Sequence, residues 1–236
     1  MRLIFIRHGD PDYVHDTLTE RGQKEAEILS ERVKDWDVTE FLCSPLGRAR
    51  ATAAYTLEKV HREATVYDWL RECSYPVKDP ETGADRLPWD WYPEFWTKYP
   101  DLYDKDKWCD TPLYQSGNMR EKYEMVCSGI DSVLSRYGYH RDGMVYHFDR
   151  SSDDTIVVFC HLGVSFMMMG HLLGISPVVL WQGFFVAPTA VTVLQTEERE
   201  AGTAAFRCQF MGDATHLTRN GAEISSSGYF AHAFQQ

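Results

Sequence analysis

Short apolar runs that each end abruptly in charged or imidazole-bearing residues constrain the fold of this chain most. The first run, residues 3–6, consists of apolar residues typical of a buried strand, and it stops at Arg7-His8-Gly9. In an open parallel α/β sheet, ligands bind outside the carboxyl ends of the strands, so residues placed there are expected to converge. Three later runs end in the same way, at Ser44-Pro45-Leu46-Gly47-Arg48 after 41–43, at Leu70-Arg71-Glu72 after 65–67, and at His161-Leu162-Gly163 after 156–160.

The stretches between these runs carry helical patterns. Thr19 is expected to be the N-cap of a helix that continues to about Lys34. Further helices are expected from about 48, over 119–137 and over 163–173, the last ended by Gly174, and strands over 190–194 and 204–210. Ser176-Pro177 is typical of the start of another helix. We therefore predict an α/β fold of three layers, α/β/α, with a mostly parallel central sheet, in a single domain over 1–236.

The converging side chains have a common chemistry. Arginine presents a planar fork of donors that suits phosphate oxygens, which we assign to Arg7 and Arg48. A neutral imidazole can attack phosphorus and form a covalent intermediate, and His8 lies beside Gly9, where backbone can approach a dianion closely. Glu72 is the candidate general acid, since a bound dianion raises the pKa of a neighbouring carboxyl group.

The chain resembles the histidine phosphatase superfamily in six stretches. They are Arg7-His8-Gly9, Leu18-Thr19-Glu20-Arg21-Gly22-Gln23, Ser44 to Ala53, Leu70-Arg71-Glu72, His161 and Gly212-Asp213-Ala214-Thr215-His216-Leu217. The resemblance implies a phosphoglycerate mutase-like fold, phosphorylation of His8, phosphate contacts from Arg7, Arg48, His161 and Gly163, and proton donation by Glu72. It implies no cofactor. His216 is expected to be a buried imidazole, hydrogen-bonded near the site.

Three departures from the family pattern narrow the activity. The run Asp10-Pro11-Asp12-Tyr13-Val14 replaces the usual Glu-Thr-x-x-Asn, so two phosphate or substrate contacts are lost. Asp10 and Asp12 are expected to repel a second anionic group, which favours a substrate with one phosphate and an otherwise neutral or cationic body. Leu162 follows His161 where the family commonly has glycine, and the surroundings of Glu72 lack the mutase pattern. A phosphatase is therefore favoured over a mutase.

Composition excludes several other classes of protein. With 35 Asp and Glu against 24 Lys and Arg, the chain carries a net charge of −11, which disfavours binding to nucleic acid. Its six cysteines lack Cys-x-x-Cys spacing and are expected to be reduced thiols in a cytoplasmic protein. We expect no signal peptide, no membrane span and no metal, because two arginines aimed into the site do not suit a metal-ligating cluster.

Residues 73–117 form a segment that is rich in aromatic side chains and lacks a sustained helical or strand period. Long connections of this kind are usually functional, and this one leaves the predicted catalytic edge directly after Glu72. We predict an inserted cap over the phosphate pocket, with Tyr13, Trp89 and Trp91 as substrate contacts. The alternative is that its tryptophans form a small satellite core or the interface of a homodimer.

The sequence thus predicts a metal-independent phosphomonoester hydrolase that acts through phosphohistidine on a small phosphorylated metabolite. Two alternatives stay open. One is a phosphoglycerate mutase-like phosphotransferase. The other is a non-catalytic regulatory module that holds phosphate in its arginine pocket, although such a module would need neither the nucleophile nor the acid.

Overall fold

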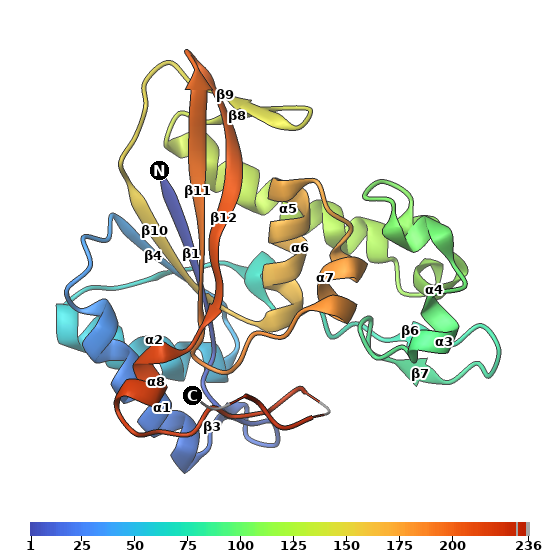
Figure 1. Ribbon diagram of the computed structural model, residues 1–236, viewed down its shortest axis with the longest axis horizontal. Coiled ribbons are helices and arrows are strands. Elements are labelled where there is room, and N and C mark those ends of the chain that lie inside the picture. The colour runs from blue at the N-terminus through green and yellow to red at the C-terminus, as the bar shows by residue number, and fades with distance from the viewer. Residues whose placement is uncertain (230, 235–236) are drawn as a thin grey trace.

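An eight-stranded sheet forms the centre of the computed structural model, which describes residues 1–229 and 231–234 (Figure 1). The strand order is β5-β4-β10-β1-β11-β12-β9-β8. β1 pairs in parallel with β10, β10 with β4, and β4 with β5, whereas the remaining four pairings are antiparallel. Only β11 and β9 therefore run against the other six strands, and the predicted mostly parallel α/β sheet is confirmed.

The parallel half consists of the four predicted strands. They are β1 (Arg2–Arg7), β4 (Glu40–Cys43), β5 (Thr65–Val66) and β10 (Thr155–Cys160). β1 lies next to β10 in a register that pairs Arg7 with Cys160, so their last residues are neighbours. This register places the residues that follow the two strands, His8 and His161, side by side at one edge of the sheet.

Helices cover both faces of the sheet. On one face, α1 (Glu20–Val33) and α2 (Gly47–Val60) pack on a core that includes Ile4, Phe41 and Phe159. On the other face, α5 (Met119–Arg136), α6 (Leu162–Leu173) and α7 (Pro177–Gly183) belong to a larger core. The predicted caps are present, because Thr19 Oγ1 accepts the amide of Gly22 and Ser176 Oγ accepts that of Val178. The three-layer prediction is thus confirmed.

The antiparallel half is more extensive than the sequence pattern suggested. β11 (Val191–Glu200) and β12 (Thr203–Asp213) form a long hairpin. Each of the two strands is longer than the strand predicted there, over 190–194 and 204–210. β8 (His140–Asp142) and β9 (Val145–His147) extend the sheet further and were not predicted, since each has only three residues and no apolar run. α8 (Thr215–Arg219) follows β12 and lies against α1.

Residues 73–117 contain only short elements, in agreement with the absence of a sequence period. These are β6 (Val77–Lys78), β7 (Asp85–Arg86), α3 (Pro93–Trp96), α4 (Pro112–Gln115) and single 3-10 turns at Pro100–Tyr103 and Trp108–Asp110. Trp108 and Tyr114 are fully buried in the core that also contains Leu3 and Phe5 of β1. The segment lies beside α7 at the right of Figure 1, and its buried side chains are continuous with the main core rather than a separate one.

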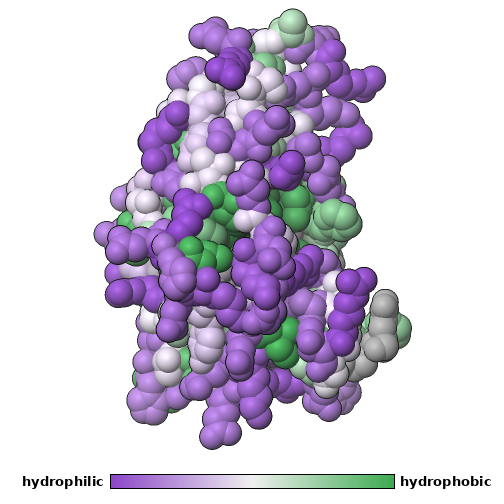
Figure 2. All heavy atoms as spheres, turned by 90° about the vertical axis from the view of Figure 1, so that its left-hand side faces the viewer, coloured by the Kyte–Doolittle hydropathy of each residue, from purple (hydrophilic) through white to green (hydrophobic). Residues whose placement is uncertain are grey.

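The surface is predominantly polar on the side that lies at the left of Figure 1. Figure 2 shows that side as mostly hydrophilic, with apolar side chains in small separate patches. Two further strands, β2 (Pro11–Asp12) and β3 (Thr17–Leu18), form a small hairpin that follows β1. Within the described ranges, none of the helices combines the length and the apolar character needed to traverse a membrane.

Candidate active site

His8 lies directly after β1 and is almost fully buried, with 2% of its surface exposed. Its Nδ1 lies 2.7 Å from the carbonyl oxygen of Gly9. A carbonyl oxygen only accepts hydrogen bonds, so Nδ1 carries the hydrogen and Nε2 holds the free electron pair. Burial, and then the charge of Arg7, lower the pKa of His8 well below its usual range. The imidazole is therefore neutral at neutral pH, which is the form required of a nucleophile.

The two arginines are anchored by atoms that the sequence pattern did not identify. Arg7 donates from Nη1 to the carbonyl of Val186 at 2.7 Å and from Nη2 to that of Ser227 at 2.9 Å. Arg48 donates from Nη1 to Asp16 at 2.6 Å, and the other oxygen of Asp16 accepts the amide of Gly47 at 2.6 Å. Both guanidinium groups are thus fixed in orientation and retain further N–H groups for an anion.

His161 is fully buried as the N-cap of α6, and its ring centroid lies 5.2 Å from that of His8. Its Nε2 lies 2.7 Å from Ser44 Oγ. Its Nδ1 has no hydrogen-bond partner among the described residues, and the same is true of Arg7 Nε and Arg48 Nε, all three being buried. A buried polar atom without a partner is costly. Three such atoms on the predicted phosphate ligands indicate a site built for an anion.

Glu72 accepts three backbone hydrogen bonds at the beginning of α6. Oε1 accepts the amides of Cys73 at 2.8 Å and Val164 at 3.0 Å, and Oε2 accepts that of Gly163 at 3.1 Å. Burial raises the pKa of Glu72, whereas the three amides act in the opposite direction. The charge of Arg48 also opposes the rise in the pKa of Glu72, and the charge of Glu72 opposes the fall that burial causes in the pKa of Arg7, so Glu72 lies within electrostatic reach of both arginines. The structure therefore brings all five predicted residues together.

Close backbone packing places the nucleophile loop against α1 and α2. A Cβ atom at Gly9 would lie 2.7 Å from the carbonyl oxygen of Gly22, so this contact requires glycine. The amide of Gly9 donates to Thr52 Oγ1 at 2.9 Å, and Thr52 Oγ1 in turn donates to the carbonyl of Arg48 at 2.8 Å. The loop that carries His8 is thereby linked to the helix that carries Arg48.

The sequence matches the model of the histidine phosphatase superfamily (branch 1) over residues 3–208. The chain belongs to this superfamily. It is 30% identical over 147 residues to 2,3-bisphosphoglycerate-dependent phosphoglycerate mutase 1 of Gloeobacter violaceus, a match that covers 58% of this chain and 56% of that protein. The matched part spans about half the length, or less, of the curated relatives.

Solved structures share the fold at low sequence identity. Phosphoserine phosphatase of Entamoeba histolytica, in complex with 3-phosphoglyceric acid, has a TM-score of 0.63 and 16% identity, with 92% of this chain and 98% of that chain covered. The alpha-ribazole phosphatase of Shigella flexneri has a TM-score of 0.58 and 20% identity, with coverage of 91% and 97%. These likenesses agree with the predicted phosphoglycerate mutase-like fold.

In this histidine phosphatase, Gly163 has a different contact from the predicted one. Its amide is bonded to Glu72 and not left free for phosphate. A Cβ atom at this position would lie 2.4 Å from the ring of Trp89 and 2.6 Å from Glu72 Oε1. The glycine therefore permits the close approach of the acid and of one cap side chain. Trp181 Nε1, which donates to the carbonyl of Gly163 at 3.0 Å, holds the same turn from α7.

The three predicted substrate contacts differ in position. Trp89 packs over Gly163 beside Glu72. Tyr13 is 63% exposed, and its ring centroid lies 5.4 Å from the guanidinium carbon of Arg48. Burial lowers the pKa of Arg7, and Tyr13 opposes this shift. Trp91 is only 5% exposed and stacks on Phe95 at 5.2 Å. The prediction for Trp91 is therefore corrected, because its ring is occupied by packing within the cap.

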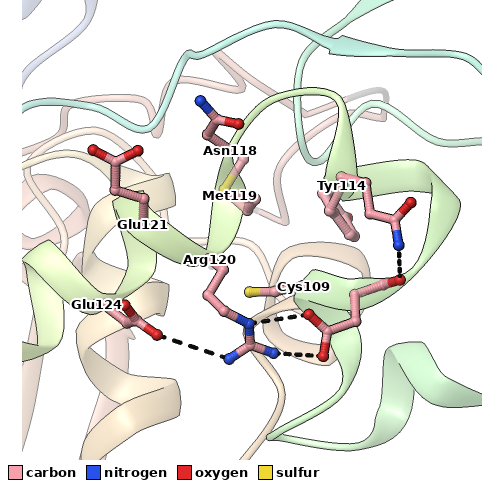
Figure 3. A pocket seen from close by; sticks show the side chains of 9 residues that line it. Cys109, Tyr114, Asn118, Met119, Arg120, Glu121 and Glu124 are labelled. Atoms are coloured by element: carbon pink, nitrogen blue, oxygen red, sulfur yellow. Dashed lines mark hydrogen bonds and ion pairs between the residues drawn. The ribbon is translucent and has the colours of Figure 1, made fainter.

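The chain also has surface cavities that are separate from these residues. A cavity of about 470 Å³ lies between the cap and α5 (Figure 3). Its central cation, Arg120, is held by Asp110 at 2.8 Å and approached by Glu124 at 4.0 Å. Carboxylates outnumber the single cation in this cavity, and none of its lining side chains has a buried polar atom without a partner, in contrast to the site around His8.

Proposed function

We propose that this chain is a phosphomonoester hydrolase that works through a phosphohistidine intermediate at His8. The observation that carries the proposal is the set of buried nitrogen atoms without partners, on Arg7, Arg48 and His161, beside a neutral imidazole. The guanidinium forks of the two arginines match the peripheral oxygens of a phosphoryl group. The other buried side-chain atoms without partners in residues 1–229 and 231–234 belong to Glu25, Thr56, Trp91 and Trp108, none of which is an arginine or a histidine.

In the first chemical step, the electron pair of His8 Nε2 attacks the phosphorus atom and forms a P–N bond. The P–O bond to the leaving group breaks, and the leaving oxygen takes a proton from Glu72. The raised pKa of Glu72 supports its role as the proton donor, and the charge of a bound dianion raises that pKa further. The guanidinium groups of Arg7 and Arg48 stabilise the charge on the phosphoryl oxygens during transfer.

In the second step, water attacks the phosphorus atom of the phosphohistidine. The Glu72 carboxylate takes a proton from that water, the P–N bond breaks, and its electron pair returns to His8 Nε2. Phosphate leaves, and both residues regain their starting states. Two guanidinium groups supply the positive charge that a metal ion supplies in other phosphatases, so we propose that turnover is metal-independent.

We propose a small metabolite with one phosphate and a neutral or cationic body as the substrate. Asp16 already occupies one face of Arg48, and Asp12 lies in the same hairpin, so a second anionic group would meet carboxylates. Phosphoserine, glucosyl-3-phosphoglycerate and alpha-ribazole phosphatases are among the similar structures, which supports a small phosphorylated substrate. All six cysteines are free thiols, which supports a reducing compartment such as the cytoplasm.

A phosphotransferase is the second candidate, because a phosphoglycerate mutase is among the curated relatives. It requires that the phosphohistidine pass its phosphoryl group to a second substrate rather than to water. The departure from Glu-Thr-x-x-Asn after Gly9 and the carboxylates of the hairpin disfavour the binding of two anionic substrates.

A panel of phosphorylated metabolites and one aryl phosphate, assayed for phosphate release in EDTA, tests the proposed function. We expect release of phosphate from the aryl ester and from a subset of metabolites with one phosphate. A strict requirement for added divalent metal would contradict metal independence. Interconversion of phosphoglycerates without phosphate release would identify a mutase, and binding without turnover would identify a non-catalytic module.

A further inference from the structure

Thr189 supports the backbone of the proposed nucleophile in an unusual conformation. Its amide lies 3.1 Å from the carbonyl oxygen of Arg7 and 3.2 Å from that of His8, and donates to both. Thr189 is fully buried, and its φ is +57°. A β-branched residue rarely adopts this left-handed conformation, which costs on the order of 1–3 kcal/mol and persists only where the surroundings impose it.

His216 holds the side chain of Thr189. Thr189 Oγ1 donates to the carbonyl of Pro188 at 2.8 Å, which leaves it to accept a hydrogen bond from His216 Nε2 at 3.1 Å. On the opposite side of the ring, Arg32 Nη1 lies 3.2 Å from His216 Nδ1. Arginine can only donate, so Nδ1 is the acceptor and the hydrogen resides on Nε2. Burial, and then Arg32, lower the pKa of His216 to about 4, in agreement with a neutral ring.

Arg32 is itself fixed from the end of the long hairpin. Its Nη2 donates to Asp213 Oδ2 at 2.6 Å. A continuous series of hydrogen bonds therefore leads from Asp213 through Arg32, His216 and Thr189 to the carbonyls of Arg7 and His8. Each donor and acceptor in the series has a defined direction, so the ring of His216 has one orientation in which all of its bonds are made.

We propose that His216, acting through Thr189, is a positioning residue for the nucleophile: it locks the 184–190 loop so that the backbone of Arg7-His8 presents His8 Nε2 in line with the phosphorus atom. The same loop supplies the carbonyl of Val186 that accepts a hydrogen bond from Arg7 Nη1. One loop therefore positions both the proposed nucleophile and a proposed phosphate ligand. Small errors in the placement of reacting atoms have large effects on rate. This inference rests on the proposed role of His8.

A double-mutant cycle separates positioning from general stabilisation. His216→Ala removes the ring, and Thr189→Gly removes the hydroxyl that the ring holds while glycine adopts a positive φ without strain. We expect His216→Ala to lower kcat for an aryl phosphate about tenfold, the rate equivalent of about 1.4 kcal/mol, with KM changed less than about twofold. In the Thr189→Gly background, the same substitution is expected to change kcat by less than about twofold.

Two further variants complete the test. His216→Gln retains an N–H donor and is expected to restore part of the lost kcat. His171→Ala is the matched control, because the ring of His171 is also largely shielded from solvent and hydrogen-bonded, to Asp131 at 2.9 Å, but lies outside the series. It is expected to leave kcat unchanged. Equal losses for His216→Ala in both backgrounds, or an unchanged kcat, would overturn the positioning role.

Nuclear magnetic resonance of the imidazole nitrogens distinguishes failure of this inference from failure of the proposed function. We expect His216→Ala to shift the ring resonances of His8, whereas His171→Ala leaves them in place. If the wild-type protein releases no phosphate, the proposed function fails, and the shift of the His8 resonances still decides whether His216 positions that ring. Resonances of His8 that are identical in the wild type and His216→Ala would contradict the inference.

Discussion

The sheet edge around His8 and the segment 73–117 are built on opposite principles. At the sheet edge, the polar side chains are buried and held by hydrogen bonds, to backbone atoms in the case of Glu72 and Arg7, and to the side chain of Asp16 in the case of Arg48. In the cap, the buried side chains are mostly apolar and include several aromatic rings, whereas Lys78 pairs with Asp85 at the surface, at 2.7 Å. The sheet edge thus has the fixed polar groups that a common chemistry needs, and we propose that the segment 73–117 determines substrate choice.

Trp89 is the point at which the two regions meet. Its ring packs on Gly163 beside Glu72, and its carbonyl accepts Nε2 of Gln182 at 2.9 Å. The remaining cap tryptophans are directed into packing, as in the contact of Trp108 with Trp181 at 5.4 Å. The comparison therefore predicts that substitutions at the sheet edge affect every substrate, and that a substitution at the meeting point affects only substrates large enough to reach the cap.

Replacement of the nucleophile is expected to have the largest effect. His8→Ala is expected to lower kcat for every phosphomonoester by about 10³-fold or more, because the covalent route is removed. Steady-state phosphate release measures this. His15→Ala, which removes an exposed imidazole bonded to Asp12 at 2.7 Å, is the control and is expected to leave kcat unchanged. Turnover by His8→Ala at a rate close to that of the wild type would contradict the assignment.

Replacement of the acid should depend on the leaving group. Glu72→Gln is expected to slow hydrolysis of alkyl phosphates about 10²-fold or more and that of an aryl phosphate much less, since a good leaving group needs little protonation. The substitution keeps one oxygen to accept the amides of Cys73 and Val164 but removes the acceptor of the Gly163 amide, so we expect it to lower the free energy of unfolding by about 1–3 kcal/mol. Comparable losses for alkyl and aryl esters would show that Glu72 positions the site and that the proton comes from another group.

We expect a buried carboxyl group near the sheet edge to make the free energy of unfolding depend on pH. The surface ion pairs of the cap are not expected to have this effect. Glu25 is 2% exposed, accepts the amide of Asp10 at 2.7 Å and lies 3.6 Å from Arg21 Nε. Burial raises the pKa of Glu25 from its ordinary 4.5 to about 7, so the folded state binds the extra proton between these values. Its contribution to stability is therefore complete below about pH 4.5 and is lost as the pH rises through about 7.

The free energy of unfolding, measured with urea at pH 5 and pH 8, tests this. We expect the wild type to lose at most about 3 kcal/mol more than Glu25→Gln over that interval. The amide side chain of this variant is neutral throughout, and its carbonyl oxygen can accept the backbone amide of Asp10. The same pH dependence in both proteins would show that Glu25 does not titrate in this range.

The smallest expected effect on the chemistry lies in the cap. Trp89→Ala is expected to lower kcat/KM for the physiological substrate about tenfold and that for a generic aryl phosphate by much less, because only the larger substrate uses the cap contact. Trp91→Ala is the matched cap variant. Since its ring is buried against Phe95, we expect it to lower the melting temperature without changing the ratio between the two substrates. Equal losses for both substrates in Trp89→Ala would contradict a role in specificity.

Local signals predicted the parts of the fold that depend on neighbouring residues. The N-caps at Thr19 and Ser176, the positive φ of Gly174 and the apolar runs of the parallel strands are each properties of a few adjacent residues. The short strands β8 and β9 were missed because their pairing is set by the tertiary context and not by their own side chains. The same reason explains why β11 and β12 are longer than predicted.

The candidate site likewise has parts that local sequence signals predict and parts that only the tertiary structure determines. The five strand-end residues could be predicted because chemistry and position coincide in the sequence. Their supports could not, since Arg7 is held by the carbonyls of Val186 and Ser227, which any residue type could supply. Asp16 and Thr189 have side chains in the support but lie in no motif, and the buried position of Trp91 follows from the packing of the whole cap.

Rapid quench with a phosphorus-labelled aryl phosphate tests the central claim most directly. The account predicts that a labelled phospho-enzyme forms within the first turnover, that its label is lost in acid and retained in base, and that peptide mapping places it on His8. Chelation by EDTA should leave the amount trapped unchanged. Hydrolysis that proceeds at the full wild-type rate without a labelled protein, or a label on any residue other than His8, would contradict the account.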